Sequence, residues 1–405
     1  MPGSVLFRNV GTLVSGDLAQ PLLEASSVFV EDGVIKEIGA ERLADTIVDV
    51  RGATLAPAYW DSHSHPYFGE YSPRVEARNV ISRTVRGGTA TLISAGPTHH
   101  PGIYLPSEQM PNIQSQARLH KPDAQRARDA SGAKALAIVM AKAWQQFRPL
   151  GVKCYAGTVI AEDGMTQEDF AEMAGAGVQR VKFIRPVSSS QECQRYGQWA
   201  HDLGLLTMTH TGGRKLVQDT ASIGDALRAI HPDVACHVNG GPIPPPRADV
   251  DWLIRETDCT LDVVLNGNMN VARYVMEQAR DRGELHRVVI GTDTPAQFGI
   301  VSRGVQRMIV ELCAMTDFRP EQLMCMASGN TARRFCLPGG LVQVGQPADL
   351  VVWDPADGSE TDDLLECLSY GDQPCPGLIM VDGEITVHGN PQALDAKRMP
   401  VVKRG

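Results

Sequence analysis

Residues 53–65 read ATLAPAYWDSHSH, an apolar, strand-like stretch that ends in two histidines. His63 and His65 stand two positions apart, so an extended strand projects both imidazole rings to one side, where they can bind one cation. A His-x-His pair alone is weak evidence, because it also arises by chance in a chain of 405 residues. The rest of the chain has to decide between a metal site and two ordinary histidines.

Three further strand-like runs end in a residue type that binds metal ions. The runs at 205–209, 234–236 and 287–292 lead into His210, His237 and Asp293 in that order. Turn-forming residues follow each of them, which is typical of parallel strands that present a C-terminal residue to a site. Four such strand ends, counting that of His63 and His65, indicate one site built from several strands.

Helix-length segments separate these runs. Residues 191–202, 249–256 and 271–282 are each long enough for one helix. Strands that alternate with helices predict a parallel α/β architecture. A (β/α)8 TIM-like barrel fits better than an open doubly wound sheet, because the polar residues follow several different strands and a doubly wound sheet has its site at one switch point.

The two ends of the chain predict a second, smaller unit of short strands, in which Asp32-Gly33 is a hairpin signal. The strand-like segments lie at 5–10, 27–39, 46–50, 348–354 and 378–387. Because both ends contribute strands, we expect a small β-sandwich domain that both chain ends form together.

The domain boundaries follow from these patterns. We expect residues 1–56 together with 342–400 to form the β-sandwich, and residues 57–341 to form the barrel. Within the barrel, segment 97–130 is long and rich in proline and arginine. Loops of that length in compact domains are usually functional or disordered. We interpret it as a lid or substrate loop, with a subunit contact as the alternative.

Composition excludes several classes of partner. The formal net charge of −9 argues against nucleic acid or an anionic membrane. No apolar stretch approaches the roughly 20 residues of a membrane span, and the first residues lack the pattern of a signal peptide. Nine cysteines at irregular spacing, without a C-x-x-C pair, indicate reduced thiols. This composition agrees with a soluble cytoplasmic enzyme, and we expect neither nucleic acid nor a membrane as a partner.

Lys182 stands among apolar residues in the strand-like run 178–184. Its ordinary interpretation is a lysine at a barrel rim that extends its ammonium group to water. A second interpretation is a desolvated, neutral amine that carbon dioxide carbamylates, which would turn it into an anionic bridge between two metal ions. Composition does not distinguish the two.

Taken together, the pattern resembles the amidohydrolase superfamily. Several stretches also look like those of enamidases, which are cyclic-amide hydrolases: 93–96, 210–213, 237–242 and 325–330. The resemblance implies a barrel with a β-sandwich and a ligand set on the first, fourth, fifth, sixth and eighth barrel strands. That set is His63, His65, Lys182, His210, His237 and Asp293.

The bridging ligand is where the chain departs from enamidases, which resemble members that use a glutamate bridge. No acidic residue follows Lys182 before Glu192, so a carboxylated Lys182 is the predicted bridge, and Glu162 is the alternative. Imidazoles and a bridging carboxylate suit two divalent metal ions, zinc first, with iron or manganese as alternatives.

The ligand set also suggests a mechanism. Two cations that share a bridging water lower its pKa enough to supply hydroxide near neutral pH. Asp293 would take the proton as the hydroxide attacks a carbonyl polarised by one metal, and would pass it to the departing nitrogen. Orientation of a histidine is the alternative role of Asp293.

Candidate substrate-binding residues are fewer. Arg74 follows the His-x-His stretch and could pair with a substrate carboxylate, or be a surface arginine. His99 could line the pocket from the 97–130 segment. Thr211 and Asn239 adjoin predicted ligands and could bond to the substrate ring, although a turn role is the alternative.

These observations predict a metal-dependent hydrolase that uses a metal-bridging hydroxide to cleave a C–N bond, that of a cyclic amide such as a lactam, enamide or imide. The alternative is a heterocyclic amine deaminase with one metal. A non-catalytic scaffold of the same fold is a third hypothesis, and the complete ligand set argues against it. Barrel hydrolases of this family often assemble, so we expect a homo-oligomer, a dimer or a tetramer.

Overall fold

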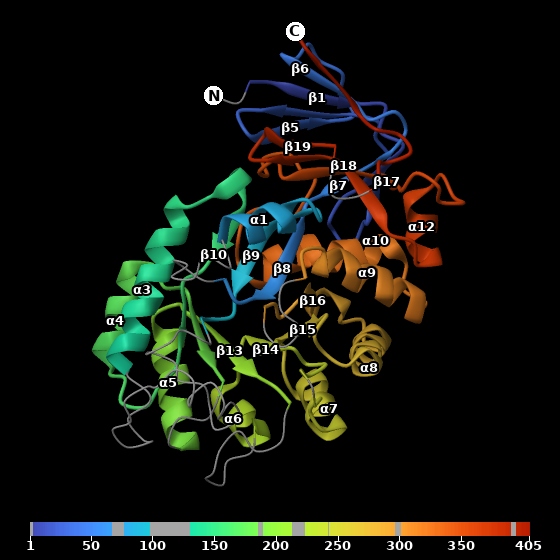
Figure 1. The fold of residues 1–405 in the computed structure, drawn as a ribbon. Coiled ribbons are helices and arrows are strands. Elements are labelled where there is room, and N and C mark those ends of the chain that lie inside the picture. The colour runs from blue at the N-terminus through green and yellow to red at the C-terminus, as the bar shows by residue number, and fades with distance from the viewer. Residues whose placement is uncertain are drawn as a thin grey trace, which may run out of the picture.

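The computed structural model describes residues 3–66, 77–97, 130–184, 189–212, 223–241, 243–295, 301–389 and 394–405. Within them the fold is mixed α/β (Figure 1). Parallel strands surrounded by helices form the larger part, and sheets built from both ends of the chain lie to one side of it. No helix in the described ranges is long and apolar enough to cross a membrane.

Two parallel sheets form the larger part. The first has the order β10–β9–β8, and the second runs from β11 to β16 in chain order. Strands in chain order and all parallel require a crossover after each strand, which is why helices alternate with them. The strands are β8 (Tyr59–Ser64), β9 (Thr89–Ser94), β10 (Lys153–Tyr155), β11 (Thr158–Ile160), β12 (Arg180–Phe183), β13 (Leu206–His210), β14 (Val234–Cys236), β15 (Thr260–Val264) and β16 (Val288–Gly291).

The chain connects the two parallel sheets at one edge, and hydrogen bonds join them at another. At one edge, β10 and β11 follow each other with only residues 156–157 between them. At the other edge, β16 adjoins β8: Asp293 N donates to His63 O at 2.7 Å, and His65 N donates to Thr294 O at 2.8 Å. Ser64 and Thr294 form an isolated parallel bridge at the same point. The ends of the first and last parallel strands are therefore held side by side.

Helices cover the outer face of the parallel strands (Figure 1). The three helices expected from sequence are present as α5 (Ser190–Asp202), α7 (Arg247–Glu256) and α8 (Met269–Asp281). The others are α1 (Ala77–Val85), α3 (Ala130–Gln146), α4 (Gln167–Ala176), α6 (Ile223–Ile230), α9 (Gly304–Met315), α10 (Pro320–Cys325), α11 (Thr331–Arg334) and α12 (Leu364–Tyr370), with a π-helical turn at Met326–Asn330.

Local signals explain where helix α4 begins and ends. The hydroxyl of Thr166 accepts from Asp169 N, and the carboxylate of Asp169 accepts from Thr166 N, which is a capping box. The helix ends at Gly177, whose φ of +98° is a left-handed conformation that glycine adopts without a Cβ clash.

The parallel strands bury apolar side chains on both faces. One cluster lies between strands and helices and includes Val181, Leu261 and Met308. A second cluster lies on the opposite side of the strands and includes Trp60, Met208 and Cys236. Because both faces are buried, these strands read as continuous apolar runs in the sequence.

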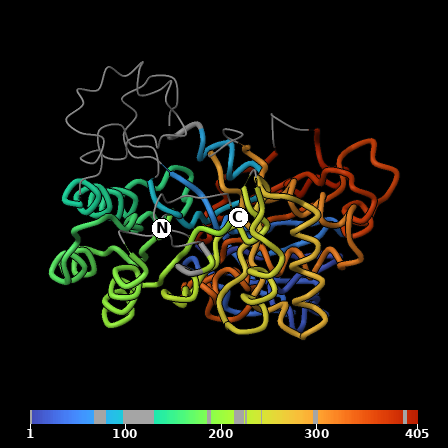
Figure 2. The backbone as a smooth tube through the Cα atoms, turned by 90° about the horizontal axis from the view of Figure 1, so that it is seen from below, coloured from blue at the N-terminus to red at the C-terminus, as the bar shows by residue number. Residues whose placement is uncertain are grey.

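Two further sheets mix strands from both ends of the chain, so the blue and red segments interleave in Figure 2. One has the order β20–β6–β1–β4–β5 and the other β19–β18–β17–β7–β2–β3. Their strands are β1 (Val5–Arg8), β2 (Thr12–Val14), β3 (Leu22–Leu23), β4 (Val28–Glu31), β5 (Val34–Ile38), β6 (Thr46–Asp49), β7 (Thr54–Pro57), β17 (Leu350–Pro355), β18 (Pro374–Val381), β19 (Glu384–His388) and β20 (Val401–Arg404).

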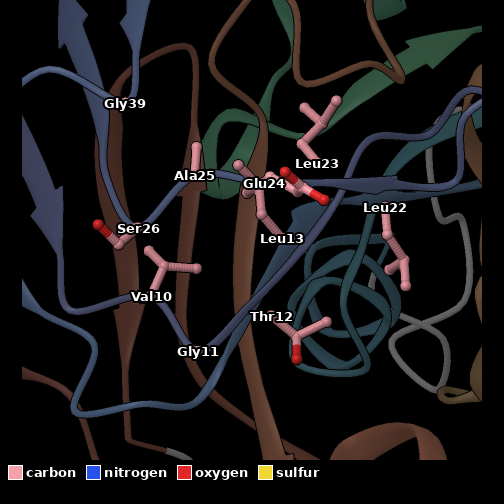
Figure 3. Close-up of a pocket in the computed structure, with 10 residues that line it drawn as sticks. All are labelled: Val10, Gly11, Thr12, Leu13, Leu22, Leu23, Glu24, Ala25, Ser26 and Gly39. Atoms are coloured by element: carbon pink, nitrogen blue, oxygen red, sulfur yellow. The ribbon is translucent and has the colours of Figure 1, made fainter.

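These two sheets share one apolar cluster that includes Phe7, Val28, Leu350 and Leu378. The expected hairpin signal is present, because Asp32 and Gly33 both have positive φ in the turn between β4 and β5. The predicted single segment 27–39 is accordingly two strands. A hollow of about 740 Å³ runs along β2 and β3 between Leu13, Leu22 and Gly39 (Figure 3).

Candidate metal centre

All six predicted metal ligands lie at or near the carboxyl ends of parallel strands. His63 lies near the end of β8, His65 directly follows that strand, and Lys182 lies in β12. His210 ends β13, His237 directly follows β14, and Asp293 follows β16 by two residues. Parallel strands place their carboxyl ends at one edge, so these residues gather there. His210 is half-buried and the other five are buried.

The four imidazole rings and the Asp293 carboxylate lie next to one another in a row. Asp293 Oδ1 lies 3.0 Å from His65 Nε2 and 3.5 Å from His63 Nε2. The centroids of the His63 and His237 rings are 5.2 Å apart, and those of His237 and His210 are 4.3 Å apart. The nearest ligand atoms of His63, His65 and Asp293 lie within 4.8 Å of one another, so one cation can reach all three.

The other ring nitrogen of each strand-β8 histidine is bonded to an acceptor. His65 Nδ1 lies 2.6 Å from Gly96 O, and His63 Nδ1 lies 2.7 Å from Asp262 Oδ2. A carbonyl or carboxylate oxygen only accepts, so in each ring Nδ1 carries the proton and Nε2 presents its lone pair. His65 Nε2 and Asp293 Oδ1 are then two acceptors at 3.0 Å, an arrangement that is stable only with a cation or a proton between them.

Unpartnered atoms give a second indication of a cation. In the part of the chain that the structure describes, His63 Nε2, Lys182 Nζ and His237 Nδ1 are buried and have no hydrogen-bond partner. A buried polar atom without a partner costs about 1–3 kcal/mol, so these atoms are suited to bind an ion or a water. Imidazole nitrogens with a carboxylate are the donor set that zinc and related divalent metals prefer. The residues therefore fit a metal centre.

Burial keeps the imidazoles in the neutral form that binds metals. Desolvation, with the nearby Lys182 ammonium, lowers the pKa of His210 to about 3. The same causes, with His210 as an added neighbour, hold the pKa of His237 well below its ordinary value. Burial raises the pKa of the Asp293 carboxyl, but the neighbouring histidines, His63 and His65 first, outweigh this effect, so the pKa is lowered. Asp293 is therefore ionised, the form in which a carboxylate can bind a metal ion.

Comparison with known proteins agrees with this geometry. The model of the amidohydrolase family matches residues 54–386, more than half of the chain. This chain belongs to the amidohydrolase family. It is 35% identical to the enamidase of Eubacterium barkeri over 97% of this chain and 98% of that protein. The imidazolonepropionase of Salinispora arenicola is 33% identical over 23% of this chain and 26% of its own length.

Solved structures extend the comparison. A crystal structure of enamidase, described as a member of the amidohydrolase superfamily, superposes with a TM-score of 0.86 at 34% identity and covers 99% of this amidohydrolase and 100% of that chain. A triazine hydrolase variant superposes with a TM-score of 0.61 at 14% identity, over 95% of each chain. The second match shows a shared fold only.

Two predicted substrate-binding residues of this amidohydrolase are bonded to the backbone. Asn239 Nδ2 donates to Val264 O at 2.8 Å, and Asn239 Oδ1 accepts from Val264 N at 2.9 Å. The Thr211 hydroxyl donates to Cys236 O at 2.8 Å. Both side chains brace neighbouring strand ends, and their contact with substrate stays a prediction. Arg74, His99 and most of the 97–130 segment lie outside the described residues.

The amidohydrolase site also contains residues that sequence reasoning missed. Asp262, in the middle of β15, bonds to the His63 ring, and Asn266 Nδ2 donates to Asp293 O at 2.6 Å. Asp262 was detectable in principle, since a charged residue inside the apolar run 260–264 needs a compensating partner. Glu162, the alternative bridging residue, is buried two residues after β11.

Proposed function

We propose that this chain is a metal-dependent hydrolase that cleaves the C–N bond of a cyclic amide. The observation that carries the proposal is that three possible metal-binding atoms converge. They are two imidazole nitrogens, His63 Nε2 and His65 Nε2, and one carboxylate oxygen, Asp293 Oδ1. Asp293 Oδ1 lies 3.5 Å from the first nitrogen and 3.0 Å from the second. Membership of the amidohydrolase family supports a metal centre at this place. Similarity to enamidase along 97% of the chain supports a lactam, enamide or imide as the substrate class.

We propose two divalent metal ions, zinc first, with iron or manganese as alternatives. His63, His65 and Asp293 would hold one ion, and His210 with His237 would hold the other. A carboxylated Lys182 would join them, with Glu162 as the alternative. The support for Lys182 is its burial: the residue is 1% exposed, and its Nζ has no hydrogen-bond partner among the described residues.

Bound divalent metal would supply a water of lowered pKa and would polarise the substrate carbonyl. Asp293 is ionised, so its carboxylate could act as the general base that takes a proton from the attacking water. Asp293 would return that proton to the departing nitrogen when the C–N bond breaks. Asn266 Nδ2 donates to the main-chain oxygen of Asp293, which helps to hold this residue in place for the transfer.

We also propose that the parallel strands close into a (β/α)8 barrel, in which β10 and β11 together occupy the third position. The bonds between residues 63–65 and 293–294 support closure at the junction of β8 and β16. Residues 57–341 would form this barrel. Residues 1–56 with 342–400 would form the β-sandwich domain, which their shared apolar cluster supports.

The location and the assembly are further parts of the proposal. All nine cysteines are free thiols, which supports a reducing compartment such as the cytoplasm. We propose a homo-oligomer, a dimer or a tetramer, as is common for soluble enzymes. Sedimentation equilibrium would test the assembly, and a monomer at micromolar concentration would contradict it.

The decisive experiment measures metal content per chain by plasma emission, for wild type and Lys182→Ala purified without chelators, together with hydrolysis of a series of cyclic amides. Two metals that fall to one or fewer in the variant, with amide opening lost on chelation, support the proposal. One metal that the substitution leaves unchanged, with ammonia release from heterocyclic amines, favours the deaminase alternative. Amide opening that survives complete metal removal would refute both.

A further inference from the structure

Asp262 accepts three hydrogen bonds beneath the metal centre although it is fully buried. Its Oδ2 accepts from His63 Nδ1 at 2.7 Å and from His237 N at 3.0 Å, and its Oδ1 accepts from Ser62 Oγ at 2.6 Å. Among the described residues, no lysine or arginine forms an ion pair with it. A buried carboxylate is costly unless its oxygens are satisfied, and here three donors from two other strand ends satisfy them.

We propose that Asp262 is a positioning residue that fixes the tautomer and the orientation of His63 for metal binding. The inference rests on the proposed function, since it concerns a ligand of the proposed metal. A carboxylate accepts only, so it holds the proton of His63 on Nδ1 and leaves Nε2 free to face Asp293. Partners of this kind around metal-binding histidines typically change metal affinity by about 10- to 100-fold.

The same carboxylate joins the two halves of the proposed centre. Oδ2 is shared between the ring of His63 and the main-chain N–H of His237, the residue proposed for the other metal position. Ser62 secures Oδ1 from strand β8. Loss of Asp262 would therefore remove the hydrogen-bond acceptor of the His63 ring and of the His237 main-chain N–H. Metal affinity should then fall at both proposed metal positions.

One alternative uses the same atoms differently. His63, Cys236 and Asp262 have ligand atoms within 4.8 Å of one another, so a cation could also be held there. Such a cation would take His63 Nδ1 and replace the hydrogen bond that orients the ring. A thiolate ligand to cobalt gives an intense charge-transfer band, which makes this alternative visible by absorption spectroscopy.

Asp61 is a matched control for Asp262. It is also a buried aspartate, and its carboxylate accepts from Thr292 N at 2.9 Å, Thr292 Oγ1 at 2.6 Å and His63 N at 3.1 Å. It therefore holds the main chain of His63 but makes no contact with the imidazole. A substitution at Asp61 disturbs packing to a comparable extent without touching the tautomer.

The test compares Asp262→Asn, Asp262→Ala and Asp61→Asn with wild type. The asparagine can keep the bonds, because its amide oxygen can accept from His63 and His237 while its amide nitrogen donates to Ser62 Oγ, but it removes the charge. Zinc affinity by chelator competition should fall about 10-fold in Asp262→Asn and about 100-fold in Asp262→Ala, and less than about 3-fold in Asp61→Asn. The Tm of each metal-free variant reports the purely structural part.

Three results would overturn the inference. The first is unchanged zinc affinity in Asp262→Ala, and the second is an equal loss in Asp61→Asn, which would mean a packing effect. The third is a cobalt–thiolate band in wild type that Cys236→Ser abolishes, which would make Asp262 a ligand. Failure of the proposed function looks different, because wild type itself would then bind no zinc.

Discussion

Gly291, the last residue of β16, packs directly against the strand that carries the two leading histidines. A Cβ placed there would lie 2.6 Å from Ser62 Oγ, 2.8 Å from His63 N and 3.0 Å from His63 Cβ. Ordinary van der Waals contact begins at 3.4 Å, so the main chain of His63 would have to retreat by about 0.6 Å. We therefore predict that Gly291→Ala separates β16 from β8 at the metal centre.

Two effects of this displacement can be estimated. Overpacking of a well-packed interior costs about 1–3 kcal/mol, which lowers the Tm of the metal-free protein. The displacement also exceeds the roughly 0.5 Å within which a functional constellation has to be held. Zinc affinity should consequently fall by about tenfold or more, or about 1.4 kcal/mol.

The assay pairs thermal unfolding of the metal-free protein with zinc affinity from chelator competition, and Gly175→Ala is the control. Gly175 lies in helix α4, where an added Cβ meets nothing within 4 Å, so that alanine should raise the free energy of unfolding by about 0.5–1 kcal/mol. A Gly291→Ala protein with unchanged Tm and unchanged zinc affinity would refute the reasoning and the close contact between β8 and β16.

Three further predictions follow from the centre. Asp293→Asn should lower kcat for cyclic amide opening by about 10²- to 10⁴-fold, the usual contribution of a positioned acid–base group, and steady-state rates near those of wild type would contradict its role. The buried histidines have lowered pKa values, about 3 for His210, so the metal-free protein should lose stability as the pH falls from about 6.5, where the unfolded chain begins to bind protons, towards 3; a Tm that is flat from pH 8 to pH 4 would contradict this. Zinc at a free concentration 100 times its dissociation constant should stabilise the folded state by about 2.7 kcal/mol, and calorimetry with no upward shift in Tm would argue against a preformed site.

Much of the centre could be predicted because its information is local. Each predicted ligand lies in, or within two residues of, an apolar strand, as with His210 at the end of β13 and His237 after β14. Such a pattern predicts both the strand and the ligand from a few neighbouring residues. Helices α5 and α8 were likewise predictable to within one or two residues, because the segments between the strand-like runs have the length of one helix.

The partners of those ligands were not predictable in this way. Asp262 and His63 are separated by 199 positions, and nothing near either residue indicates the other. Gly96 O was equally invisible, since any backbone carbonyl can accept from a histidine. Short strands such as β3, with two residues, were missed because they have too few residues to show a period.

Strand β7 has a consequence for how the protein is made. It lies in the mixed sheet beside β17, and only Ala58 separates it from β8, which carries His63. The pairing partner of β7 is therefore synthesised about 300 residues later, since β17 begins at Leu350. The neighbouring sheet gains its strand β20, Val401–Arg404, later still. Contacts between such distant segments form slowly, because a long loop has to close first. While the chain is still on the ribosome, the sheets beside the strand that contains His63 would therefore lack β17 and β20 until both have been synthesised.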